Sequence, residues 1–155
     1  MKTGSLFRAN YNSTHDVVVN QGGTSSGKTY AILQVLFTLA VQSKCTITVC
    51  GQDIPNLKVG ALRDAIDIHN NTDLFKQELK AYNRSERIFT FFNGSTIEFN
   101  SYDNDQDAKS GKRDYLFINE ANGIPYIVFE QLHLRTRLRT YIDYNPDTSF
   151  WVHDK

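Results

Sequence analysis

Gly22-Gly23-Thr24-Ser25-Ser26-Gly27-Lys28-Thr29 is the stretch that decides the fold of this 155-residue chain. It fits G-x-x-x-x-G-K-[ST], the phosphate-binding loop of nucleotide triphosphatases. The flanks fit as well: residues 16–20 predict a short buried strand that runs into the loop, and residues 30–40 predict the helix that leaves it. A glycine-rich turn with a surface lysine is the alternative interpretation. With both flanks present, the sequence favours a site for the phosphates of ATP.

The whole loop, from Gly22 to Thr29, is predicted to bind ATP mainly through its backbone. Successive N–H groups form a concave anion site, and the free amides and positive dipole end of the following helix face the same phosphates. Lys28 is expected to reach the β- and γ-phosphates and to serve catalysis. The Thr29 hydroxyl is expected to ligate Mg²⁺. ATP and Mg²⁺ are therefore the predicted cofactors.

The composition is that of a globular domain, with 40% hydrophobic and 22% charged residues. No apolar run is long enough to span a membrane, and the N-terminus lacks the apolar core of a signal peptide. Cys45 and Cys50 bracket a predicted strand, too far apart for a disulfide, so both are expected to be free thiols in a reducing cytoplasm. The formal net charge of zero neither supports nor excludes a nucleic-acid partner.

Strand and helix patterns alternate along the chain, which predicts an α/β fold with a mostly parallel sheet covered by helices on both faces. Asn93-Gly94 between two β-prone runs predicts an antiparallel hairpin with a type I′ turn. Residues 102–113 are polar and are expected to form a loop. The other expected elements are strands at 47–50, 115–118 and 139–143, helices at 55–70, 73–81 and 125–134, and hairpin strands at 87–92 and 95–100.

Polar residues follow three of the predicted strands, and parallel sheets bind ligands at the carboxyl ends of their strands. The phosphate loop, Asn119-Glu120 and Tyr144-Asn145 should therefore meet at one rim. Leu116 to Glu120 has the Walker B form, an apolar strand ending in two acceptors. Glu120 is the candidate that polarises the attacking water. Asn119 stands where most such ATPases have the aspartate of the Mg²⁺ shell, and Asp143 is a candidate for some of the missing charge.

On these residues the chain resembles the ATPase domain of the large terminase subunit of tailed bacteriophages. The resemblance covers roughly residues 7–152. It is carried by Gly22 to Thr29, by the Asn-Glu-Ala-Asn string at 119–122 and by the Asp-Tyr-Asn-Pro string at 143–146. It implies a P-loop NTPase fold of the additional-strand catalytic-glutamate type. It also implies ATP hydrolysis that powers translocation of double-stranded viral DNA into a procapsid.

The resemblance also implies partners and further site residues. The implied partners are double-stranded DNA, the small terminase subunit and the portal protein, with a homo-oligomeric ring on the portal, in the cytoplasm of the bacterial host and without a membrane. Asn145 would belong to the segment that couples hydrolysis to movement. Gln21 would lie on the adenine side, where Tyr11 is a candidate to stack on the base. Arg113 is the first choice for an arginine that reaches a neighbouring subunit's nucleotide, with a solvated basic loop as the alternative.

Two departures from the family pattern are visible. Many terminases carry a cation inside the phosphate loop, whereas this chain has Thr24, Ser25 and Ser26 there. Family members also continue into further strands and a metal-dependent nuclease domain. We therefore expect residues 1–155 to form a single, incomplete ATPase domain without the nuclease domain. Three alternatives stay open: a helicase- or recombinase-like DNA motor, a non-hydrolysing nucleotide-binding assembly module, and a small-molecule kinase.

Overall fold

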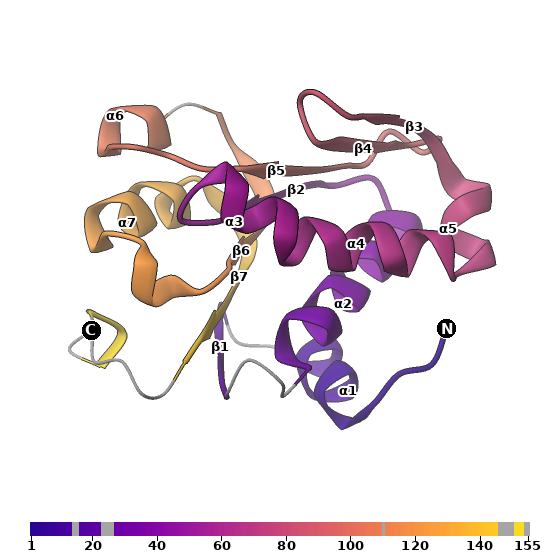
Figure 1. Cartoon of the computed structure of the whole chain (residues 1–155), viewed down its shortest axis with the longest axis horizontal. Helices are drawn as coiled ribbons and strands as arrows, with labels where there is room; N and C mark the ends of the chain where they lie inside the picture. Colours follow the sequence, from indigo (N-terminus) through magenta and orange to yellow (C-terminus); the bar gives the residue numbers. More distant parts are fainter. Residues whose placement is uncertain (14–15, 23–26, 110, 146–150, 154–155) are drawn as a thin grey trace.

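In the computed structural model, which describes residues 1–13, 16–22, 27–109, 111–145 and 151–153, seven strands form one mixed sheet. Its order is β1-β7-β6-β2-β5-β4-β3, with β1 to β5 in this row parallel and the β5-β4-β3 edge antiparallel (Figure 1). This confirms the predicted fold class. The strands are β1 (Val17–Gln21), β2 (Thr46–Cys50), β3 (Leu79–Asn83), β4 (Ile88–Phe91), β5 (Thr96–Asn100), β6 (Arg113–Ile118) and β7 (Thr136–Tyr144).

Helices cover both faces of the sheet, and each face has its own hydrophobic core. One core joins the sheet to α1 (Ser5–Asn12), α2 (Lys28–Gln42), α3 (Ile54–Val59), α4 (Ala61–Asn70) and α5 (Asp73–Glu78). The other joins it to α6 (Asp105–Ala108), α7 (Tyr126–Leu134) and the single turns η1 (Ala121–Gly123) and η2 (Trp151–His153). Cys45 and Cys50 are buried free thiols, as predicted. None of the helices in the described ranges is long and apolar enough to cross a membrane.

The helix predicted at 55–70 is interrupted at Gly60, which separates α3 from α4. Gly60 has φ −118° and ψ −102°, outside the helical region. A side chain there would bring a Cβ to 3.1 Å from the Asn56 carbonyl oxygen. α3 begins one turn earlier than its apolar stripe, because the Asp53 side chain accepts a hydrogen bond from the Asn56 N–H. The break turns the start of α4 toward the phosphate-loop helix.

The edge of the sheet contains a strand that the sequence did not predict. The helix expected at 73–81 ends at Glu78, and Leu79–Asn83 forms β3 instead. β3 pairs with β4, and the Tyr82 ring packs against Phe89 with ring centroids 4.4 Å apart. Contacts made across the sheet therefore outweigh the local helical tendency of this segment.

The hairpin between β4 and β5 is confirmed, but its turn is not of type I′. Asn93 has a negative φ and Gly94 has φ +92°, whereas a type I′ turn needs positive values at both. The Gly94 N–H donates to Phe91, and the Phe91 N–H donates to Ser95, which is the pattern of a three-residue loop. This turn frees the Asn93 side chain to donate to the Ala40 carbonyl at 2.8 Å, which ties the hairpin to the end of α2.

Two short helices complete the differences from the predicted elements. The polar segment at 102–113 contains α6, whose first turn is capped by the Asn104 side chain, which accepts from the Asp107 N–H. Arg113 already belongs to β6 rather than to the loop. α1 was not predicted. It is fastened to β1 by two hydrogen bonds between the side-chain amides of Asn10 and Asn20.

The hairpin offers a matched test of the first core. Phe91 is 1% exposed and packs edge-on against Phe37, whereas its neighbour Phe92 is 67% exposed. We expect Phe91→Ala to lower the free energy of unfolding by about 3–5 kcal/mol, because it removes a buried ring and leaves a cavity. Phe92→Ala should change it by less than about 0.5 kcal/mol. Urea denaturation measures both, and equal losses would contradict this packing.

Candidate active site

The position of β7 between β1 and β6 brings the predicted site residues together. Asn20 pairs with Asp143 across β1 and β7, and Ile118 pairs with Ile142 across β6 and β7. Side chains alternate between the faces of a strand. Phe117 and Tyr141 belong to the core beneath α2, so Asn119 and Asp143, two residues further on, project to the side of α2 as well.

α2 begins directly at the predicted phosphate-binding residues. Gly27 precedes its first turn with φ +77°, a left-handed conformation that glycine adopts without strain. Lys28 and Thr29 form the first turn, and the Lys28 side chain is largely buried. The Gly22 N–H donates to the Tyr144 carbonyl at 3.3 Å, which holds the exit of β1 next to the end of β7. Gly23, Thr24, Ser25 and Ser26 lie outside the described residues, so their predicted contacts with phosphate stay predictions.

Asp143 is the centre of a hydrogen-bonded cluster at this rim. The Thr29 hydroxyl donates to its Oδ2 at 2.6 Å. The Asn119 side-chain amide lies 3.2 Å from both carboxylate oxygens. The backbone N–H of Glu120 donates to Oδ1. The cluster joins residues of α2, β6 and β7.

The carboxyl of Asp143 has its pKa raised above the usual range, because burial removes it from water. The hydrogen bonds from Thr29 and from the Glu120 backbone, the charge of Lys28 and the Asn119 amide all act in the opposite direction but do not overcome burial. The side chain is fully buried. Buried carboxyl groups in proteins are hydrogen-bonded or paired, and this one has both kinds of partner.

Glu120 stands at the mouth of the same cluster. Its backbone is left-handed, with φ +52° and ψ +59°, and it leads into the η1 turn. A non-glycine residue in this conformation is uncommon and is held in place here by the bond to Asp143. Its side chain is exposed, so it can contact water while its backbone stays fixed.

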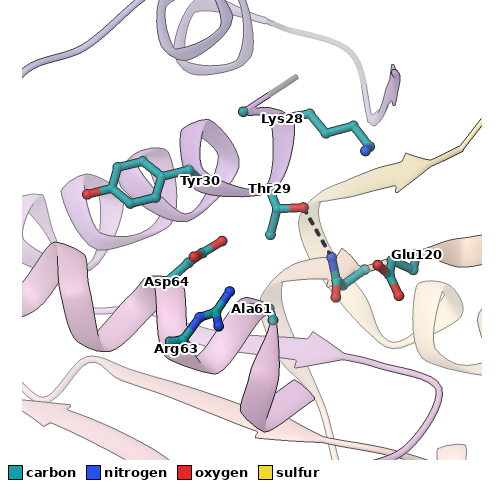
Figure 2. A pocket seen from close by; sticks show the side chains of 10 residues that line it. Lys28, Thr29, Tyr30, Ala61, Arg63, Asp64 and Glu120 are labelled. Carbon is teal, nitrogen blue, oxygen red and sulfur yellow. Dashed lines mark hydrogen bonds between the residues drawn. The ribbon is translucent and has the colours of Figure 1, made fainter. Parts of the chain in front are cut away.

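These residues line a cleft of about 180 Å³ between the start of α2 and the start of α4. Figure 2 shows Thr29 and Glu120 on one side of it, with Arg63 and Asp64 reaching toward it from α4. The sequence analysis missed the α4 wall. The signal that could have found it is Gly60, a glycine inside an otherwise helical pattern, just before Arg63. The cleft is lined by Gly27, Lys28, Thr29, Tyr30, Gly60, Ala61, Arg63, Asp64, Asn119 and Glu120.

The predicted adenine-side residues do not line this cleft. Gln21 is exposed at the end of β1, and Asn145 is half-buried just after β7. Tyr11 is wrongly placed to stack on the base. Its hydroxyl accepts a hydrogen bond from Gln42, which ends α2, about 20 Å along the helix from Lys28.

The aromatic residue of α1 that lies beside the phosphate loop is Phe7 rather than Tyr11. Phe7 lines a second hollow, of about 380 Å³, together with Gly27 and Tyr30. The hollow is closed on one side by the N-terminal segment, which the Gln34 side chain holds by donating to the Lys2 carbonyl at 2.8 Å. An aromatic face next to the phosphate loop is thus present, but it comes from the opposite end of α1.

Arg113 is not brought to the site, and its predicted role in a neighbouring subunit is incompatible with its position. It begins β6, at the end of the strand opposite Asn119. It is 4% exposed, and its guanidinium donates to the Thr48 hydroxyl at 3.0 Å and to the Leu132 carbonyl at 2.9 Å. An arginine that reaches another subunit must be exposed, so the position of Arg113 indicates a structural residue.

Comparison with known proteins gives one matching family. The model described as "Terminase large subunit, T4likevirus-type, N-terminal" matches residues 20–153. No curated protein sequence is significantly similar to the chain.

Several solved structures share the fold. The large terminase of a thermophilic bacteriophage superposes with a TM-score of 0.74 at 14% identity, over 94% of this chain and 40% of that one. The ATPase domain of the Thermus phage P74-26 large terminase gives 0.72 at 15% identity, over 99% of this chain and 68% of that one. The HK97 bacteriophage large terminase gives 0.69 at 10% identity, over 93% and 33%. This chain therefore spans about 40% of the length of the first of these proteins.

The placement of Arg113 can be tested by stability alone. We expect Arg113→Ala to lower the free energy of unfolding by about 2 kcal/mol or more, because it leaves the Leu132 carbonyl and the Thr48 hydroxyl without their charged donor. Lys112→Ala removes an exposed cation next to it and should have little effect. Both are measured by urea denaturation of the ligand-free chain. Full stability of the Arg113 variant would restore it as a candidate for the other subunit's nucleotide.

Proposed function

Because the chain belongs to the family of T4likevirus-type terminase large subunits, of which it matches the N-terminal part, we propose that it is an ATPase that drives translocation of double-stranded viral DNA into a procapsid. The observation that carries the proposal is the cluster of Thr29, Asn119, Glu120 and Asp143 beside Lys28, at the start of α2. Related structures with ADP and with ATP-gamma-S, both of the thermophilic bacteriophage enzyme, support a nucleotide at the corresponding place.

The phosphates would lie in the cleft, against the first turn of α2. Lys28 would contact the β- and γ-phosphates, in keeping with the role of this lysine in phosphate-binding loops. Arg63 is a second cation on the walls of the cleft, and it would supply from α4 the charge that Thr24, Ser25 and Ser26 do not. The adenine is proposed to occupy the hollow beside Phe7.

The residues at the cleft fit a magnesium ion bound together with the phosphates. Thr29 would hold it through its hydroxyl oxygen, and Asn119 through its carbonyl oxygen, by way of a bound water. Mg²⁺ would neutralise charge on the β- and γ-oxygens.

Glu120 is proposed as the general base. Its exposed carboxylate would orient a water molecule and accept its proton as the water oxygen attacks the γ-phosphorus in line with the bond to the bridging oxygen of ADP, which breaks. The left-handed backbone at Glu120 keeps the carboxylate at the mouth of the cleft. Asn145, directly after β7, would belong to the segment that responds to loss of the phosphate.

The proposed partners belong to the whole protein. They are double-stranded DNA, a small terminase subunit, a portal protein and further copies in a ring, in the cytoplasm of the bacterial host. A second candidate, a nucleotide-binding assembly module that does not hydrolyse, is favoured by Asn119 in place of an aspartate. ATP binding without turnover in the presence of DNA and the partners would support it.

Lys28→Ala tests nucleotide binding. Removing a charge-assisted contact worth about 1.5–3 kcal/mol should weaken ATP binding tenfold or more. Lys44→Ala, at the other end of α2, is the control and should bind as the native chain does. Isothermal titration calorimetry gives both affinities. Unchanged affinity in the Lys28 variant would refute the phosphate site.

Glu120→Gln separates binding from hydrolysis. The variant should bind ATP normally, because the side chain contacts water rather than phosphate, and turnover should fall roughly a hundredfold to ten-thousandfold. Phosphate release by the full-length protein with DNA is the measurement, and Glu86→Gln, in an exposed turn, serves as the control. Normal turnover would remove Glu120 from the proposed role.

A further inference from the structure

The carboxylate expected at the end of β6 is present instead at the end of β7. Asn119 ends β6 and carries no charge, so it cannot act as the acidic residue that usually organises the magnesium shell in this class. Asp143 ends the neighbouring strand, and its Oδ2 lies 2.6 Å from the Thr29 hydroxyl. Within the described cleft and its walls, no other carboxylate is hydrogen-bonded to that hydroxyl.

We propose that Asp143 takes over, from β7, the positioning role of the missing Walker B aspartate, and that it also holds the backbone of Glu120. The inference rests on the proposed ATPase function and assigns a residue within it. Asp143 acts through its neighbours, so it is a positioning residue rather than a catalytic one.

The hydrogen bond to Thr29 leaves that residue able to bind a metal. A hydroxyl has one proton and two lone pairs. Donating the proton to Asp143 orients the lone pairs away from the carboxylate, toward the cleft, and makes the oxygen a better ligand. A threonine without this partner would be free to rotate about its side-chain bond.

The bond to Asn119 settles which way that amide faces. Its nitrogen is 3.2 Å from the Asp143 oxygens, so its carbonyl oxygen points elsewhere and is available for a metal-bound water. An aspartate at 119 would put a second carboxylate in contact with Asp143, and the two charges would repel. The pair therefore works as an exchanged set, with an amide on β6 and an acid on β7.

The third bond joins the metal side of the site to the water side. The same carboxylate that receives the Thr29 hydroxyl also receives the Glu120 N–H. A change in the partners of Thr29 is thereby felt at the backbone of the proposed base. Asparagine keeps the size of aspartate and its acceptor oxygen but loses the charge, so it is the discriminating substitution.

The experiment measures how Mg²⁺ changes nucleotide affinity, which does not depend on turnover. We expect the native chain to bind ADP more tightly when Mg²⁺ is added, and Asp143→Asn to lower the apparent Mg²⁺ affinity by about 10–100-fold while metal-free ADP binding stays the same. Asp64→Asn removes the cleft carboxylate that does not contact Thr29. If the Asp64 variant, and not the Asp143 variant, loses the Mg²⁺ effect, the assignment is overturned.

A double variant guards against a simple loss of folding. Asn119→Asp combined with Asp143→Asn returns the acid to β6, and we expect it to recover at least a tenfold part of the lost Mg²⁺ affinity. No recovery, with both proteins folded by circular dichroism, would overturn the exchange. If the native chain binds no ADP at all, the proposed ATPase function fails. If it binds with a Mg²⁺ effect that Asp143→Asn leaves intact, only this inference fails.

Discussion

The arrangement of the cleft depends on the insertion of β7 between β1 and β6. Parallel pairing on both sides brings three strand ends to one level, and the alternation of side chains aims Asn119 and Asp143 at α2. The first turn of α2 then needs only Gly27 in a left-handed conformation to set Lys28 and Thr29 above them. A shift of one residue in the β7 register would turn Asp143 into the opposite core.

Local signals were sufficient for the parts of this fold that rest on periodicity and turn chemistry. The strand, loop and helix around Lys28 and the strand leading to Glu120 carry their information within a few residues. Asp143 was recognised as a candidate source of charge, but its partners lie 114 residues away at Thr29 and 23 residues away at Glu120. Such distances in sequence leave no local pattern, which is why the cluster itself appeared only in three dimensions.

The errors have a common physical origin in contacts that propensity does not contain. Arg113 looked like part of a basic surface loop, yet pairing with its neighbours buries it at the start of β6. Leu79–Asn83 looked helical, yet β4 offers it a partner. Tyr11 was the aromatic nearest the phosphate loop in sequence, but the direction of α1 places Phe7 there instead. In each case a long-range neighbour decided the outcome.

The buried cysteines make the chain its own reporter of opening. The Cys50 carbonyl accepts the Asn119 N–H at 2.9 Å, and burial raises the pKa of the Cys50 thiol to about 12. A thiol in that state does not react with alkylating reagents, because the thiolate is the nucleophile. Alkylation of Cys50 therefore requires the nucleotide end of β2 to separate from its surroundings. The rate of that reaction, with and without nucleotide, reads the local opening of the site without any added label.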